Sequence, residues 1–279
     1  MKANGMKKIV LFILGILLTA PSHECFAWGR NGHATITYIA ERHLTPQAKA
    51  NIEKCLDGGS MVYYSSWLDY HRDEHKVWKR LRHTFDIDIA TGKPAGRPIK
   101  QLRSSLKKLH NYQELPDSTL KLSLYHFLHA FGDFHCPGHI QHVDYTGEKP
   151  KIVKYTDYDV YYAPRKKRIQ YHKLWDTPVL SHNHTDWGYM DWGHALDSGV
   201  SQEYIDRVTA GTLEDWFTEA ASSTVRIYSD IPRSPKGAKD EELPVVTLNL
   251  MNEYGDLAAE QMLKAGLRMA KLINEIFGE

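Results

Sequence analysis

The chain has 279 residues, 35 basic and 34 acidic side chains, and a formal net charge of +1. This near-neutral balance excludes recognition of nucleic acid by overall charge, so any attraction for a polyanion must be local. Hydrophobic residues make up 42% of the chain. No Gly/Ser- or Pro-rich linker divides it, which predicts one well-buried domain.

The first 27 residues have the layout of a secretory signal peptide. An almost unbroken apolar run over residues 9–20 follows a basic start, and Ala27 ends a short polar stretch. The run is too short for a comfortable transmembrane span, and an uncleaved anchor is the alternative. Cleavage after Ala27 leaves 252 residues, from Trp28 to Glu279, with 32 basic and 33 acidic side chains. We therefore expect an exported monomer, periplasmic or secreted, with no transmembrane segment after processing.

Two helices are expected soon after this cleavage point. Asn31 can cap the first, and one face of it is formed by His33, Ile36, Ala40 and Leu44. Thr45 followed by Pro46 is a cap with proline at the first helical position, which predicts a second helix toward Leu56.

The central helix is predicted to begin at Asp117, after another amphipathic helix over residues 99–109. One stripe of it is apolar and consists of Leu120, Leu124, Phe127 and Phe131. A second stripe consists of Leu122, His126, His129 and Asp133. Helical bundles build interior metal sites from helices that are apolar on one side and carry ligand-type side chains on the other.

The helical pattern disappears over residues 144–169. Tyrosines, charges, Gly147 and Pro150 predict a long loop there, with a small hairpin around Val160. Helical signals resume near Ser201 and again over residues 212–228. The last helix is the clearest, with one face traced by Ala258, Met262, Ala265, Met269, Leu272 or Ile273, and Ile276. We therefore predict an all-α, single-domain multi-helix bundle over residues 28–279, with a long loop or small hairpin around 144–169.

The densest group of histidines and aspartates lies within this helical pattern, over residues 129–139. His129 and Asp133 are one helical turn apart, so both side chains project from the same face. His139 follows, and His172 and Asp176 lie downstream. Imidazole nitrogen and carboxylate oxygen suit a borderline cation such as Zn²⁺, which generates hydroxide at neutral pH. A buried helix face with several ionisable groups costs too much unless they are paired or bound to metal. The cluster therefore indicates hydrolysis rather than simple binding.

Five motifs in chain order resemble the S1/P1 family of zinc-dependent nucleases, relatives of the bacterial zinc phospholipases C. They are Trp28-Gly-Arg-Asn-Gly-His33, Ser66-Trp67-Leu68-Asp69, His83, the segment 129–139, and His172-Lys-Leu-Trp175-Asp176. The resemblance covers essentially all of the chain after residue 27. It implies the helical fold of that family and three zinc ions.

The resemblance also assigns ligands to each zinc ion. One ion would be held by Asp69, His83, His129 and Asp133, and the second by His139, His172 and Asp176. The third would take His33, Asp133 as a bridge, and the free α-amino group and carbonyl oxygen of Trp28. Signal cleavage would then create a metal ligand, because an amide nitrogen does not coordinate as an amine does.

Further roles follow from matching positions in the family. Asp69 and Arg72 would be catalytic, with Arg72 neutralising charge that builds up in the transition state. Asp86 would bind a nucleobase edge. The alternatives are a solvated surface position for Arg72, and a helix cap or surface position for Asp69 and Asp86. His126 is expected to support a ligand or to pack in the core rather than to bind metal.

The chain departs from the family pattern at several positions. Cys136-Pro137-Gly138 stands where the family usually has Gln-Pro-Leu, and Thr84 stands where an aromatic residue often stacks on a base. Cys136 could also form a disulfide with Cys55, or both could stay reduced. The basic run at residues 165–168 could follow a phosphate backbone or form a charged hairpin tip.

Three functions are consistent with these patterns. The first is an exported zinc phosphodiesterase that hydrolyses single-stranded RNA and DNA to 5′-mononucleotides, with 3′-nucleotides as further substrates. The second is a zinc phospholipase C acting on phospholipid head groups, which the loss of an aromatic at Thr84 motivates. The third is a non-catalytic zinc- or nucleic-acid-binding protein.

Overall fold

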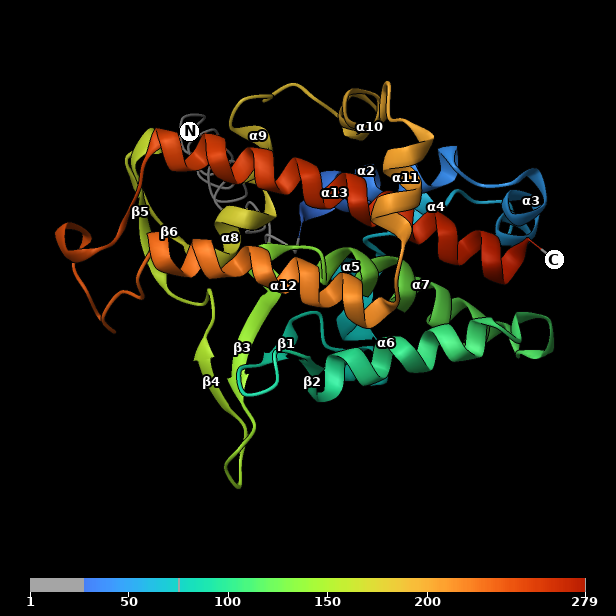
Figure 1. Ribbon diagram of the computed structural model, residues 1–279, viewed down its shortest axis with the longest axis horizontal. Helices are drawn as coiled ribbons and strands as arrows, with labels where there is room; N and C mark the ends of the chain where they lie inside the picture. The colour runs from blue at the N-terminus through green and yellow to red at the C-terminus, as the bar shows by residue number, and fades with distance from the viewer. Residues whose placement is uncertain (1–27, 75, 279) are drawn as a thin grey trace, which may run out of the picture.

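The computed structural model describes residues 28–74 and 76–278 (Figure 1). The predicted signal peptide lies outside the described residues. The α-helices are α2 (Gly29–Arg42), α3 (Pro46–Cys55), α4 (Met61–Tyr64), α5 (Trp67–His71), α6 (Gly96–Leu109), α7 (Asp117–Asp133), α8 (Tyr171–Asp176), α9 (Pro178–Ser181), α10 (Tyr189–Asp197), α11 (Gln202–Thr209), α12 (Leu213–Asp230) and α13 (Leu248–Phe277). The strands are β1 (Phe85–Asp88), β2 (Pro94–Ala95), β3 (Ile140–Asp144), β4 (Lys151–Lys154), β5 (Asp159–Tyr162), β6 (Lys167–Gln170) and β7 (Val245–Val246). The described part of the chain is thus mostly helical, which confirms the all-α prediction.

The N-terminal helices follow the predicted caps only in part. Thr45 caps α3, since its hydroxyl oxygen accepts the N–H of Ala48 at 3.2 Å, and Pro46 is the first helical residue. The prediction that Asn31 caps α2 is wrong, because α2 already begins at Gly29 with Trp28 at the N-cap. The Asn31 side chain instead donates to the carbonyl of Trp187 at 3.0 Å.

The core is built around α7 and α13. Helix α7 begins at Asp117 as predicted, and every residue from Ser123 to Asp133 is buried. Such all-round burial identifies α7 as the central helix. It packs against α6, α5, α13, α2 and α4. The predicted stripe on the last helix is also buried, apart from half-buried Leu272.

Helix α13 is longer than the predicted face. It spans 30 residues and begins at Leu248, where the hydroxyl oxygen of Thr247 accepts the N–H of Leu250 at 3.3 Å. The helix runs along the length of the molecule beside α12 and ends at the C-terminus (Figure 1). It packs against α2, α3, α9 and α11, so the last helix holds the first two in place.

Two small sheets complete the fold. One has the strand order β2-β1-β3-β4, with β1 parallel to β3 and β3 antiparallel to β4. The other has the order β6-β5-β7, and its β5–β6 hairpin is the one predicted around Val160. The β5–β6 hairpin lies at the end of the molecule opposite the C-terminus (Figure 1). Strands β1, β2, β3, β4 and β7 were not predicted, and β4 lies within the segment 144–169 that was predicted to be mostly loop. None of the helices in the described ranges is long and apolar enough to cross a membrane.

Candidate metal centre

The fold brings the predicted ligand side chains together at the middle of the molecule. Three groups have imidazole nitrogens and carboxylate oxygens that all lie within 4.8 Å of one another. They are His33 with Asp69 and His129, His83 with His129 and Asp133, and His139 with His172 and Asp176. The first two groups share His129, so they form one overlapping cluster. The third group matches the set predicted for the second zinc ion.

His129 and Asp133 on α7 are the centre of the overlapping cluster. Nε2 of His129 lies 3.1 Å from a carboxylate oxygen of Asp69 and 3.2 Å from one of Asp133. The other oxygen of Asp133 lies 3.3 Å from Nε2 of His33. The His33 and His129 rings stack with their centroids 4.3 Å apart. The two carboxylate oxygens of Asp133 therefore lie next to different histidines, one near His33 and the other near His129.

Backbone carbonyls orient two of the histidines. Nδ1 of His129 donates to the carbonyl of Ser65 at 3.1 Å, so Nε2 is the ring nitrogen that faces the carboxylates. Nδ1 of His172 lies 3.1 Å from the carbonyl of Gly138, which also accepts the hydroxyl of Thr156 at 2.7 Å. A hydrogen bond at one ring nitrogen fixes the tautomer that leaves the other nitrogen free to bind a metal. No sequence pattern predicted these supporting groups, because two of them are backbone carbonyls.

Trp28 lies beside the same cluster. Its indole N–H donates to the carbonyl of Gly132 at 2.9 Å, and the residue is fully buried. Burial raises the pKa of the Cys136 thiol well above its usual range, while backbone hydrogen bonds from Gly138 and Trp28 oppose this shift. The backbone of Trp28 therefore reaches Cys136, three residues after Asp133. The carbonyl oxygen of Trp28 accepts the N–H of Gly32 at 3.1 Å, which leaves one lone pair of that oxygen unused.

Many ligand-type atoms in this centre are buried without a hydrogen-bond partner among the described residues. They include both ring nitrogens of His33 and His139, both carboxylate oxygens of Asp133 and Asp176, Oδ2 of Asp69 and Nε2 of His129. A buried polar atom without a partner costs about 1–3 kcal/mol, and more when it is charged. Bound cations would supply partners for the carboxylate oxygens, for Nε2 of His129 and for one ring nitrogen each of His33 and His139. The donor set of imidazole and carboxylate fits Zn²⁺.

The pKa shifts describe a centre whose charges need a cation. Burial alone would lower the pKa of His129, but Asp133 and Asp69 outweigh it and raise that pKa to about 9. Burial alone would raise the pKa of Asp133, but His129 and His33 hold it below its usual range. Burial, with Asp69 and Asp133 nearby, raises the pKa of Asp176 well above normal. Asp176 therefore lacks a nearby positive charge strong enough to favour its ionised form.

His126 lies next to this centre but belongs to none of the three groups. Its Nδ1 lies 2.8 Å from the hydroxyl oxygen of Ser105 on α6. Burial, with the nearby charge of His129 second, lowers its pKa to about 3. His126 is therefore a neutral, buried histidine that joins α7 to α6.

Asp86 lies on β1 rather than on a helix, and it is hydrogen-bonded. Its carboxylate accepts the hydroxyl of Tyr145 at 2.7 Å, and burial raises its pKa. Arg72 begins the short 3₁₀ helix that follows α5, and its side chain lies outside the described part of the structure. Its predicted catalytic role therefore stays a prediction.

The structure explains the glycine at position 138 and distinguishes between the alternatives for the cysteines and for the basic run. A Cβ atom at Gly138 would lie 2.6 Å from Cβ of Trp175, so the glycine makes room for that indole on α8. Cys55 and Cys136 are both free, and Cys136 is buried. At the basic run, Arg168 is paired with Asp240 at 2.8 Å and with Asp159 at 3.4 Å. The run is therefore a charged hairpin tip whose last arginine is already neutralised.

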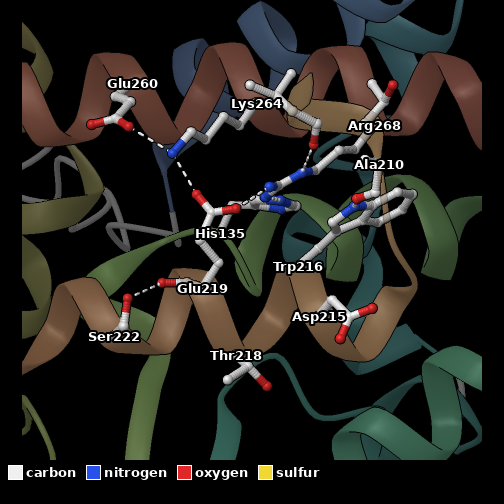
Figure 2. A network of polar contacts seen from close by, with 12 residues as sticks. His135, Ala210, Asp215, Trp216, Thr218, Glu219, Ser222, Glu260, Lys264 and Arg268 are labelled. Carbon is white, nitrogen blue, oxygen red and sulfur yellow. Dashed lines mark hydrogen bonds and ion pairs between the residues drawn. The ribbon is translucent and has the colours of Figure 1, made fainter. Parts of the chain in front are cut away.

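An ionic network around the buried Arg268 lies beside the centre, between α12 and α13. Glu219 on α12 binds Lys264 and Arg268 on α13. Arg268 is 2% exposed, and its guanidinium also lies 3.2 Å from Nε2 of His135, two residues after Asp133 (Figure 2). Nδ1 of His135 donates to the carbonyl of Phe131 at 3.0 Å. The network thus ties the end of α7 to both C-terminal helices.

Comparison with known proteins identifies relatives that align with nearly the whole chain. A family model described as S1/P1 nuclease matches residues 28–278. Nuclease PA3 of a Penicillium species and Nuclease P1 of Penicillium citrinum are each 25% identical over 277 residues, which cover 90% of this chain and 98% of the relative. Endonuclease 2 of Arabidopsis thaliana is 22% identical over 302 residues, covering 97% of each chain. These relatives support a nuclease function. The chain belongs to the S1/P1 nuclease family.

Proposed function

We propose that the chain is an exported zinc-dependent phosphodiesterase that hydrolyses single-stranded RNA and DNA to 5′-mononucleotides and also accepts 3′-nucleotides. The observation that supports this most is the convergence of buried imidazole nitrogens and carboxylate oxygens that have no hydrogen-bond partner among the described residues. His33, His129, Asp69 and Asp133 also form ion pairs at 3.1–3.3 Å, whereas the ring nitrogens of His139 have no hydrogen-bond partner among the described residues. Buried polar atoms in folded proteins are normally paired, so these nitrogens favour a bound cation.

Three zinc ions would occupy the overlapping cluster and the third group. His33 and Asp133, with the free amino group and carbonyl of Trp28, would hold one ion. A second would lie between Asp133 and the side chains of Asp69, His83 and His129. The last would lie among His139, His172 and Asp176. When bound, zinc lowers the pKa of a water molecule and neutralises charge on a phosphate.

The residues of the chain prepare this chemistry. Ser65 and Gly138 hold the two histidines of different groups in the tautomers that present Nε2. The carboxylates of Asp69, Asp133 and Asp176 offset the charge of the cations in a buried site, where an unpaired charge would be costly. Arg72 would stabilise negative charge on the reacting phosphate. Asp86 would accept a hydrogen bond from a base edge in place of Tyr145.

Export and processing belong to the same proposal. Cleavage after Ala27 would give Trp28 a free amino group close to Cys136 and Asp133. The uncleaved chain has an amide nitrogen at that position, and it should therefore hold less metal. Mass spectrometry of protein purified from its producing cells tests the cleavage site, and a chain that still begins at Met1 would contradict it. We expect the processed protein to be a monomer.

A substrate panel tests the proposed activity. Zinc-loaded protein beginning at Trp28 would be given single-stranded RNA and DNA, 3′-AMP and short-chain phosphatidylcholine. The account predicts hydrolysis of the nucleic acids and of 3′-AMP, and its loss in Asp133→Asn. Asp206→Asn is the matched control, because Asp206 is an exposed residue on α11. Preferential hydrolysis of phosphatidylcholine would decide for a phospholipase. Undiminished hydrolysis by Asp133→Asn would show that the activity comes from elsewhere.

A further inference from the structure

An aromatic cleft lies directly beside the metal centre. It encloses about 560 Å³, and the residues that matter here are Arg30, Tyr63, Trp67, Tyr70 and Tyr189. None of them is a proposed metal ligand or a residue assigned above to base or phosphate recognition. We call this feature the aromatic cleft.

The walls of the aromatic cleft come from the same segments that carry the ligands. Ala34 lines the cleft and directly follows His33 on α2. Ser66 also lines it, three residues before Asp69 and directly after the carbonyl that orients His129. A molecule bound at the metal centre through a phosphate would therefore have its neighbouring atoms within reach of the cleft.

The rings in the cleft are exposed in front and supported behind. Tyr63 is 71% exposed and Tyr70 is 46% exposed. Trp67 is held edge-on to Trp78 with centroids 4.4 Å apart, and it contacts Tyr125 at 4.7 Å. Large exposed aromatic side chains gathered in a cleft beside a reactive centre mark a binding surface. Because His71, Trp78 and Tyr125 fix the Trp67 ring before a ligand arrives, that side chain loses little entropy on binding.

Arg30 gives the cleft a positive charge. Its guanidinium carbon lies 4.8 Å from the centroid of the Tyr70 ring. Among the residues that the structure describes, no carboxylate forms an ion pair with Arg30. Glu74, which follows the cleft wall in sequence, is paired with His71 at 2.8 Å. A guanidinium beside stacking rings matches the alternation of phosphates and bases in a nucleic-acid strand.

We propose that the aromatic cleft binds the nucleotides next to the scissile phosphate of a single-stranded substrate. The bases stack on Tyr63 and Tyr70, and Arg30 binds the adjoining phosphate. This inference rests on the proposed nuclease function and adds the path of the strand. Only unpaired bases offer open faces to such rings, so the cleft selects single strands over duplexes.

Direct binding measurements test the cleft separately from catalysis. The probe is a fluorescent ten-nucleotide phosphorothioate oligothymidylate that resists cleavage, added to zinc-loaded protein beginning at Trp28. Tyr63→Ala should bind it about tenfold more weakly, as expected for the loss of one stacked base. Arg30→Gln should bind more weakly and reduce the slope of log Kd against log salt by about one phosphate contact. Arg207→Gln is the matched control, because Arg207 lies over the ring of Tyr204 at 5.1 Å on α11, and it should bind as the wild type does.

An abasic version of the strand sharpens the test. The wild-type protein should bind the abasic strand more than about tenfold more weakly than the normal strand, because every stacked base is lost, and Tyr63→Ala should show no further loss with it. Equal loss from Tyr63→Ala with both strands would overturn the proposal, as would wild-type affinity in the Tyr63 and Arg30 variants. Weaker phosphatidylcholine hydrolysis by these variants without weaker oligonucleotide binding would also overturn it. If the wild-type protein bound the probe through the cleft but cleaved no nucleic acid, this result would refute the nuclease proposal while supporting strand binding by the cleft.

Discussion

Replacing Gly132 by alanine should disturb the metal centre while leaving the helix that carries it intact. Gly132 precedes Asp133 on α7, where the helix passes close to α2. A Cβ atom at this position would lie 2.9 Å from Nδ1 of His33 and 3.2 Å from Cε1 of the same ring. Ordinary contacts of this kind begin at 3.4 Å. The His33 ring would therefore have to retreat by about 0.5 Å, which is the tolerance of a preorganised site.

The size of the effect follows from two opposing contributions. Alanine favours a helix over glycine by about 1 kcal/mol, which offsets the crowding in the metal-free protein. Supporting residues of metal sites typically change metal affinity by about 10- to 100-fold. Zinc at 1,000 times its Kd stabilises a protein by about 4.1 kcal/mol, and at 100 times by about 2.7 kcal/mol. A tenfold loss of affinity in Gly132→Ala should thus remove about 1.4 kcal/mol of the stabilisation by zinc.

The assay compares thermal unfolding with and without chelator, together with zinc analysis. Gly255→Ala is the control, because a Cβ there meets only the carbonyl of Val179 at 3.7 Å. That variant should gain about 1 kcal/mol in both states. In Gly132→Ala, the increment on adding zinc should shrink and the metal-free protein should unfold nearly as the wild type does. Wild-type zinc affinity in Gly132→Ala would refute the placement of His33 as a ligand.

Three further predictions concern residues around the centre. Thr156→Val removes a hydroxyl that lies 3.2 Å from Nδ1 of His172. Zinc affinity should therefore fall about 10- to 100-fold in a competition assay. Unchanged affinity would show that Thr156 does not orient His172. Glu219→Ala leaves Arg268, which is 2% exposed, without its carboxylate partner. The free energy of unfolding, measured in urea, should therefore fall by about 3 kcal/mol. A change below about 1 kcal/mol would contradict a stabilising role for the Glu219–Arg268 pair. Burial lowers the pKa of His142 to about 4 from its ordinary value of 6.5, so the unfolded chain binds more protons between these values. The free energy of unfolding should therefore fall as pH drops from 6.5 to 4, and His142→Asn should lose that part of the pH dependence.

Local chemistry made much of the fold predictable. Thr45 with Pro46 and the apolar periodicity of α13 rest on neighbouring residues in sequence, and the structure confirms both. The start of α2 was missed because Trp28 has a φ of 50° at the N-cap while its indole reaches Gly132, 104 residues away. A contact of that sequence separation leaves no local pattern.

The strands, and the groups that orient the proposed metal ligands, could not be predicted for the same reason. Strand β1 has four residues and pairs in parallel with β3, more than 50 residues later, so no local signal defines it. The cluster around His129, Asp133 and His139 was predicted from residue type and spacing, and the family resemblance added His33, Asp69 and His83; the structure places these side chains together. The carbonyls of Ser65 and Gly138 could not be predicted, since every residue has such a group. Asp86 was predicted to bind a nucleobase edge. Its hydrogen bond to Tyr145 was not predictable, because it depends on the path of the chain just after β3.

Zinc titration of the metal-free protein beginning at Trp28 tests the central claim most directly. Bound zinc and the rate of hydrolysis of a single-stranded oligonucleotide would be measured in the same samples. The account predicts three bound ions per chain, no hydrolysis by the metal-free protein, and activity that returns as the centre fills. Full hydrolysis by protein that holds no metal, or a chain that binds no zinc, would contradict it.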